Sequence, residues 1–221
     1  MHASSMQHMQ DLLQRYLDPR TPLTMADIGS YDVNGSYRAL IGHTQWRYTG
    51  VDLEPGPNVD VVMESPYRLP FATASMDVLI SGQALEHMDF FWVSWLEMIR
   101  VVRPGGLIFM IAPSRGPEHR YPVDCWRFYP DGFDALARWG GADSVEISTD
   151  WSPHEDPASA VWGDTVGVFR VSAAGWRHRI ARDLILRLSR RMLRSRLGTT
   201  RPLHAGRDRG PGAVGGTALE G

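Results

Sequence analysis

The chain has no lysine, so all 23 of its basic residues are arginine. It therefore cannot contain G-x-x-x-x-G-K-[ST], which excludes a phosphate-binding P-loop. Its single cysteine, Cys125, excludes a disulfide within the chain and favours a reducing cytoplasm. No apolar run reaches the roughly 20 residues of a membrane span, and the first residues do not resemble a signal peptide. We therefore expect a cytoplasmic protein.

The charge is unevenly distributed along the chain. Residues 170–221 hold 12 arginines against three acidic residues, a net charge of +9, whereas the remainder carries −11. An acidic body is unfavourable for nucleic acid, so we expect no nucleic-acid partner. The basic end could dock on the acidic body, form a homo-oligomer, or lie on an anionic membrane surface.

Apolar runs alternate with helical patterns along most of the chain, which predicts an α/β fold with a doubly wound, Rossmann-like sheet. Helices are expected over 4–18, 36–42, 89–101 and 131–142. Strands are expected over 23–28, 47–52, 59–63, 75–82, 106–113, 145–148 and 165–172. Ligands of such sheets bind at the carboxyl ends of the strands.

Four segments organise the chain. Residues 1–22 hold an N-terminal helix that caps or lids the pocket, and 23–174 form the main domain. A basic amphipathic helix follows over 175–197, and the Gly-rich residues 198–221 are expected to be disordered. The basic helix carries an apolar stripe made of Trp176, Ile180, Leu184, Ile185, Leu188 and Met192.

The loop after the first strand indicates a nucleoside-containing cofactor. The strand ends on Asp27, a loop with Gly29 and Gly35 follows, and the next strand ends on Asp52. This arrangement is how an open α/β sheet binds such cofactors. The dinucleotide fingerprint G-x-G-x-x-G is broken, because Tyr31 follows where its second glycine would stand. A cofactor without phosphates is therefore favoured.

Four segments, DIGSYDVNGSY, YTGVDL, LPFATASMDVLISGQALEHM and VVRPGGLIFMIAPS, resemble the successive motifs of class I S-adenosylmethionine-dependent methyltransferases. The resemblance spans residues 23–172, and the later block YPVDCWRFYPDG is similar to a type 11-like, small-molecule subgroup. It implies S-adenosyl-L-methionine as cofactor and a seven-stranded, mostly parallel sheet. The last strand would be antiparallel, with helices on both faces.

The resemblance also implies cofactor roles for individual residues. Asp52 would accept both ribose hydroxyls, Leu53 would cover the adenine, and Glu64 would bind the adenine amino group. Asn34 would supply a left-handed turn, since Asn tolerates that conformation best after Gly. Asp27, Asp52 and Glu64 could instead be a turn cap, a solvated strand end and a surface acid. The methionine end and the sulfonium would be lined by Asp27, Gly29, Ser30, Ser81, Gly82 and Gln83.

Histidines near two strand ends are candidates for the chemistry. A hydroxyl acceptor needs a base, and the ordinary pKa of histidine, near 6.5, suits that role. His119, His87 and Asp124 are the catalytic candidates, although His87 could be structural. The acceptor would be bound by polar and aromatic residues of the same loop: Arg115, Tyr121, Trp126 and Arg127.

Other interpretations stay open at this point. Asp124 and Arg127 could be a loop-stapling ion pair, and a loop with Trp151, His154, Glu155 and Asp156 could close over the acceptor. No spacing matches a metal motif, so no metal is expected. The predicted reaction is O-methylation of a sugar, glycolipid or secondary-metabolite hydroxyl. Carbon or nitrogen methylation of a small molecule, or a non-catalytic scaffold role, are the alternatives.

Overall fold

The computed structural model describes residues 3–155, 159–173 and 176–197. The predicted tail over 198–221 and Asp156 lie outside the described residues. Four α-helices, α1 (Ala3–Tyr16), α2 (Phe91–Val101), α3 (Pro130–Gly140) and α4 (Trp176–Leu197), and two 3-10 helices, η1 (Tyr37–Leu40) and η2 (Leu85–His87), occur in this part. Its strands are β1 (Leu23–Ile28), β2 (Trp46–Asp52), β3 (Val61–Val62), β4 (Met76–Gly82), β5 (Val102–Arg115), β6 (Ala142–Thr149) and β7 (Gly163–Val171).

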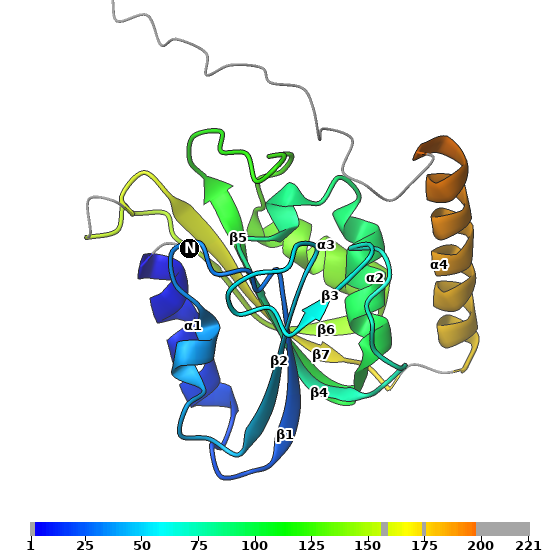
Figure 1. Ribbon diagram of the computed structural model, residues 1–221, viewed down its shortest axis with the longest axis horizontal. Coiled ribbons are helices and arrows are strands. Elements are labelled where there is room, and N and C mark those ends of the chain that lie inside the picture. The colour runs from blue at the N-terminus through cyan, green and yellow to red at the C-terminus, as the bar shows by residue number, and fades with distance from the viewer. Residues whose placement is uncertain (1–2, 156–158, 174–175, 198–221) are drawn as a thin grey trace, which may run out of the picture.

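The strands form one seven-stranded sheet in the order β3-β2-β1-β4-β5-β7-β6 (Figure 1). The pairs from β3 through β5 are parallel, whereas β7 runs antiparallel to both β5 and β6. The predicted fold class is therefore confirmed. The strand order reverses between β1 and β4, which places the ligand crevice of such a sheet outside the carboxyl ends of these strands.

Two apolar cores cover the two faces of the sheet (Figure 1). On one face α1 buries Met9 and Leu12 against strand residues such as Phe109. On the other face α2 and α3 bury Trp95 and Phe133. The strands read as continuous apolar runs because they are buried on both faces.

The predicted helix over 36–42 is wrong in type. The structure has only the 3-10 helix η1, which Ser36 caps by accepting a hydrogen bond from the Arg38 amide. The left-handed turn predicted for Asn34 is also wrong, because the positive φ falls on Gly35, at 115°. Gly35 adopts that conformation without steric cost, and its amide donates to Asp32 Oδ1 at 2.7 Å.

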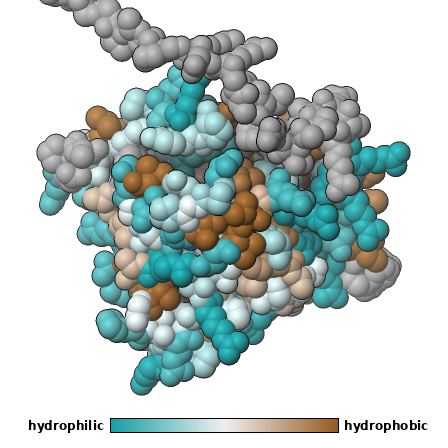
Figure 2. All heavy atoms as spheres, in the orientation of Figure 1, coloured by the Kyte–Doolittle hydropathy of each residue, from teal (hydrophilic) through white to brown (hydrophobic). Residues whose placement is uncertain are grey.

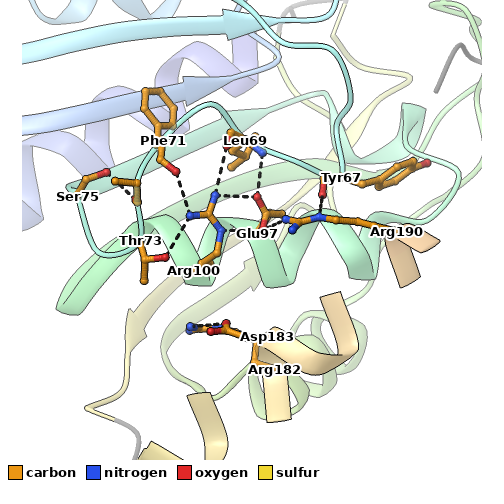
Figure 3. Close-up of polar contacts among 11 residues, drawn as sticks. Tyr67, Leu69, Phe71, Thr73, Ser75, Glu97, Arg100, Arg182, Asp183 and Arg190 are labelled. Carbon is orange, nitrogen blue, oxygen red and sulfur yellow. Dashed lines mark hydrogen bonds and ion pairs between the residues drawn. The ribbon is translucent and has the colours of Figure 1, made fainter. Parts of the chain in front are cut away.

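Helix α4 packs outside α2 through a face that combines an apolar cluster with the polar contacts drawn in Figure 3. Leu186 is buried there, and Arg190 pairs with the fully buried Glu97 of α2. Glu97 also accepts hydrogen bonds from the Leu69 amide at 2.9 Å and from Arg100 at 2.7 and 2.8 Å. None of the described helices is both long enough and apolar enough to cross a bilayer.

Candidate functional site

The ends of β1 and β4 approach each other closely at two glycines. Gly29 has a φ of +82°, and a Cβ added to it would lie 2.4 Å from Ala84 Cβ. A Cβ on Gly82 would lie 1.9 Å from the hydroxyl oxygen of Tyr37. Neither position can carry a side chain without a shift of its neighbours, because Ala84 packs against Gly29 and Tyr37 packs against Gly82.

Asp52 ends β2 beside this crevice. Its Oδ2 accepts a hydrogen bond from the Tyr31 amide at 3.0 Å, and its Oδ1 accepts from the Leu53 amide at 2.6 Å. The carboxylate thereby fixes the loop after β1 to the end of β2. An ionised carboxylate has about four acceptor sites, so capacity for further donors remains. The side chain is only partly buried.

Asn58 joins the two loops that follow β1 and β2. Its amide nitrogen donates to the Ser30 carbonyl at 2.8 Å and to the Tyr48 hydroxyl oxygen at 3.0 Å. Ser30 Oγ donates in return to the Asn58 carbonyl at 3.1 Å. Asn58 takes a φ of +68°, the left-handed conformation that the sequence analysis assigned to Asn34. The sequence signal was the turn Gly56-Pro57-Asn58.

Two residues assigned to the cofactor direct their polar groups into the protein. Asp27 is 2% exposed and accepts a hydrogen bond from the Tyr48 hydroxyl. Burial raises the pKa of Asp27 to about 7, although the Tyr48 bond opposes this shift. Ser81 is also buried, and its hydroxyl donates to the Ile28 carbonyl at 2.9 Å. Both side chains stabilise the strand ends around the crevice.

Gln83 follows β4 in a left-handed conformation, with a φ of +56°. Its side-chain nitrogen donates to Asp164 Oδ1 at 2.8 Å, and its side-chain oxygen is buried without a hydrogen-bond partner. Leu53 is partly buried against the core, and Glu64 is exposed. The partly exposed Asp52 carboxylate can accept hydrogen bonds from a diol, and the buried, unsatisfied Gln83 oxygen can interact with a cationic group.

Asp124 organises the loop between β5 and α3. Its carboxylate binds the Arg127 guanidinium through two hydrogen bonds of 2.5 and 2.8 Å and accepts from the His119 amide at 2.8 Å. Burial acts to raise the pKa of Asp124, but Arg127 and the His119 amide outweigh it and hold the pKa at about 2. Arg127 also donates to the Pro117 carbonyl at 2.9 Å. The loop-stapling pair is thus formed.

The two candidate histidines lie side by side. The ring centroids of His87 and His119 are 4.9 Å apart, in an edge-to-face arrangement. His87 Nδ1 is hydrogen-bonded to the Val123 carbonyl, and His119 Nδ1 lies 3.3 Å from Asp124 Oδ2. Burial lowers the pKa of both imidazoles, which favours their neutral forms at pH 7.

Glu86 lies beneath this pair and was not singled out from the sequence. It is fully buried, neither carboxylate oxygen has a hydrogen-bond partner, and Oε1 lies 3.6 Å from His87 Nε2. Burial raises the pKa of Glu86 to about 8, so the carboxyl is mostly protonated at pH 7. Its place directly before His87 was the available sequence signal.

Exposed aromatic side chains surround the same loops. Tyr129 and Trp151 face each other with an interplanar angle of 10° and a centroid distance of 6.3 Å. Tyr121 is 63% exposed, and Trp126 is anchored by a 3.0 Å bond from its indole nitrogen to the Met88 carbonyl. Arg115 donates to the carbonyls of Trp151 and Trp162, at 3.3 and 3.5 Å, and so ties together the loops after β5 and β6.

A second histidine–carboxylate cluster, missed by the sequence analysis, lies where α1 meets the sheet. His8 Nε2 is 2.8 Å from Asp150 Oδ2, and Ser4 Oγ donates to Asp164 Oδ2 at 3.1 Å. The hydrogen bond to Asp150 raises the pKa of His8, and burial raises that of Asp164. Because Gln83 shares Asp164, the N-terminal part of α1 is joined to the end of β4. The lid role predicted for this helix stays a prediction.

Among the residues that the structure describes, two groups of side chains could hold a metal ion. One consists of Glu86, His87 and His119, and the other of His8, Asp150 and Asp164; in each group one ligand-type atom per residue lies within 4.8 Å of the others. Either group would need its protonated members to lose their protons before coordinating a cation.

The comparisons with known proteins agree with this geometry. A methyltransferase domain family matches residues 27–110. An uncharacterised methyltransferase of Mycobacterium leprae is 32% identical over 164 residues, covering 65% of this chain and 58% of the relative. A 2-methyl-6-phytyl-1,4-hydroquinone methyltransferase of Synechocystis is 25% identical over 183 residues, covering 69% of this chain and 56% of the relative.

A solved structure has the same fold. It is a 1,6-didemethyltoxoflavin-N1-methyltransferase of Burkholderia thailandensis with bound S-adenosylhomocysteine, at a TM-score of 0.61 and 19% identity, over 76% of this chain and 79% of that one. The chain spans only part of the length of its curated relatives. The aligned share is 58% of the Mycobacterium leprae protein, 56% of the Synechocystis protein and 37% of an uncharacterised methyltransferase of Mycobacterium avium. Residues 27–110 thus match a methyltransferase domain, and the similar proteins and the fold are those of class I S-adenosylmethionine-dependent methyltransferases, whose cofactor is S-adenosylmethionine.

Proposed function

We propose that this protein methylates a hydroxyl of a small, polyhydroxylated acceptor, such as a sugar, a glycolipid headgroup or a secondary metabolite. The observation that carries the proposal is the paired arrangement of His119 and Asp124 in the loop after β5. Loops at the carboxyl ends of strands carry function on a rigid scaffold. With a single cysteine, the protein is proposed to act in a reducing cytoplasm.

The chain offers a distinct set of residues to each end of the cofactor. S-adenosylmethionine supplies, when bound, an electrophilic methyl group on a sulfonium. Asp52 would hold the ribose diol, and Leu53 would cover the adenine. The backbone at Gly29 and Gly82 would lie against the methionine end, while the buried Gln83 oxygen would face the cationic end.

His119 is proposed as the general base. Since burial lowers its pKa, the imidazole is mostly neutral at pH 7 and can accept a proton. Asp124 Oδ2 lies 3.3 Å from His119 Nδ1, which makes no hydrogen bond in this geometry. A hydrogen bond between them in the bound state would hold the proton on Nδ1, as a carboxylate does in other histidine–aspartate pairs. His119 Nε2 is then the atom that takes the proton of the acceptor hydroxyl. Asp124 is a positioning residue in this proposal.

The exposed aromatic residues of the loops after β5 and β6 support a sugar-like acceptor. Tyr129 and Trp151 present nearly parallel rings at the protein surface, and Tyr121 is largely exposed. Flat aromatic surfaces can pack against the apolar faces of sugar rings, while polar side chains bind the hydroxyls. His87 is tied to the Val123 carbonyl and packs against His119, so we assign it to positioning the base.

The first test is calorimetric titration with S-adenosylmethionine, S-adenosylhomocysteine and, as a control, NADH. We expect micromolar binding of the two sulfur nucleosides and no heat from NADH. Absence of binding by both sulfur nucleosides would overturn the proposal. Binding without turnover on a broad panel of hydroxylated acceptors, assayed with a tritiated methyl donor, would favour the scaffold alternative.

The second test is His119→Ala, compared with His43→Ala, which changes an exposed histidine outside the proposed site. Loss of a general base should lower kcat about 10²–10⁴-fold. Affinity for S-adenosylhomocysteine should stay unchanged in both variants. Full turnover in His119→Ala would favour carbon or nitrogen methylation, whereas an equal loss of cofactor affinity would move His119 out of the acceptor site.

A further inference from the structure

Helix α4 binds the protein body through a mixed side, in which Leu186 and Leu193 pack against an apolar cluster beside the arginine contacts. Arg182 is 8% exposed and Leu186 1% exposed, and Arg190 reaches the buried Glu97 and the Tyr67 carbonyl, the latter at 2.9 Å (Figure 3). These contacts fix the orientation of the helix about its own axis. The side of α4 that faces away from α2 is therefore defined.

That outer side is apolar. Ile180, Leu184 and Leu188 follow one another at intervals of four residues, which places them on one helix face. They are 58%, 54% and 53% exposed, and the neighbouring Ile185 is 39% exposed. An amphipathic helix of a globular protein ordinarily turns this face to the core. In Figure 2, brown and teal spheres lie side by side at the edge where Figure 1 places α4.

The charge around this face selects among possible occupants. Residues 176–197 contain eight arginines and one acidic residue, Asp183, which pairs with Arg182 at 3.1 Å. Arg187 and Arg191 are exposed beside the apolar residues. A second copy docked helix to helix would bring two strongly basic segments together, which costs free energy. An anionic surface would instead match both the apolar and the basic residues.

A hollow beside the helix strengthens the positive field. It lies between α4 and the segment before β4, and Arg68 and Arg187 line it together with Arg100 and Arg190. Arg100 and Arg190 share the carboxylate of Glu97. Arg68 and Arg187 thus add positive charge beside the apolar face, where acidic headgroups could bind.

We propose that α4 is an interfacial helix that lies on an anionic lipid surface. Ile180, Leu184 and Leu188 would enter the boundary between headgroups and acyl chains, while Arg187 and Arg191 would contact acidic headgroups. Helices with an apolar face and an arginine-rich polar face bind membranes in this way. The body of the protein stays in water, held to the helix by the Arg190–Glu97 pair.

The test is cosedimentation of the full chain with vesicles of phosphatidylcholine alone or mixed with phosphatidylglycerol. We expect binding to the mixed vesicles that weakens as salt rises, because salt screens the arginines. Leu184→Ser/Leu188→Ser should reduce partitioning about tenfold or more. Arg187→Gln/Arg191→Gln should reduce it about fivefold for each arginine.

The matched control is Arg20→Gln/Arg138→Gln, which removes the same charge from exposed sites away from α4. It should bind vesicles almost as the unaltered chain does. Any of three results would overturn the proposal. The unaltered chain could fail to bind mixed vesicles, or the leucine variant could bind them equally well. The unaltered chain could also be a dimer in solution while the leucine variant alone is a monomer, which would assign the apolar face to self-association. Thermal unfolding confirms that each variant is folded.

Discussion

Asp52→Ala is the sharpest test of the cofactor assignment. Asp52 accepts hydrogen bonds from the amides of Tyr31, Leu53 and Glu54, at 3.0, 2.6 and 3.4 Å. We propose that the remaining acceptor capacity of its two oxygens binds the ribose hydroxyls. The substitution removes the proposed ribose ligand and the bond that holds Tyr31, and so acts on the loop after β1 as well.

The magnitude follows from the number and setting of these bonds. A hydrogen bond to a charged group contributes about 1.5–3 kcal/mol. Asp52 is partly exposed and already satisfied by backbone amides, so we take the lower end for one bond. About 1.4 kcal/mol corresponds to a tenfold change in affinity. Asp52→Ala should therefore weaken binding of S-adenosylhomocysteine at least tenfold.

The ribose assignment is tested by calorimetry of three variants, Asp52→Ala, Asp52→Asn and the control Glu54→Ala. Glu54→Ala removes an exposed acid two positions along the chain and should keep the original affinity. Asp52→Asn keeps the shape of the side chain but replaces one acceptor oxygen by a donor, so it should lose most of the affinity too. Unchanged affinity in a folded Asp52→Ala variant would refute the ribose assignment.

Three further predictions follow from named contacts. If His119 is the base, kcat/KM should rise with pH along a limb whose apparent pKa is below 6.5, and a limb above pH 7 would contradict that role. Arg190→Ala should lower the free energy of unfolding by about 1–3 kcal/mol in urea titrations, because the buried Glu97 then has one guanidinium partner instead of two. The control variant Arg191→Ala should change the free energy of unfolding little. Burial raises the pKa of Glu86 to about 8, so the folded protein holds this proton more tightly than the unfolded chain does. The resulting contribution to folding stability is fully present below the unfolded pKa of Glu86 and is lost as pH rises towards 8. The melting temperature of Glu86→Gln minus that of the unaltered chain should therefore increase from pH 5 to pH 8. A difference that stays constant would show that the Glu86 carboxyl does not titrate in this pH range.

The strands of the sheet could be predicted from the sequence because each is marked by residues within or next to the strand itself. Strands β1, β4 and β7 were predicted within two residues of their observed bounds, since each is a buried apolar run between turn residues. The loop after β1 was less predictable. Asn34 and Gly35 are both able to adopt positive φ, and the choice depends on which amide can reach Asp32.

Helix α4 shows a different limit. Its periodicity identifies an apolar stripe, but not the side on which the helix is bound. That choice depends on Glu97, which lies more than 90 residues away and whose burial requires a cation. Arg100 already binds both oxygens of Glu97, and Arg190 adds a second cation. This contact and the packing of Leu186 and Leu193 against α2 together leave the apolar stripe facing outward.

The two histidine–carboxylate pairs contain histidines whose pKa values are shifted in opposite directions. His8 bonds to Asp150, which raises its pKa, whereas burial lowers the pKa of His119. Neighbouring titratable groups whose pKa values are pushed in opposite directions commonly carry the acid and base assignments. At neutral pH His119 is the better proton acceptor, while His8 retains more of its positive charge. His8, Asp150 and Asp164 come from three distant segments, so their meeting could not be read from local motifs.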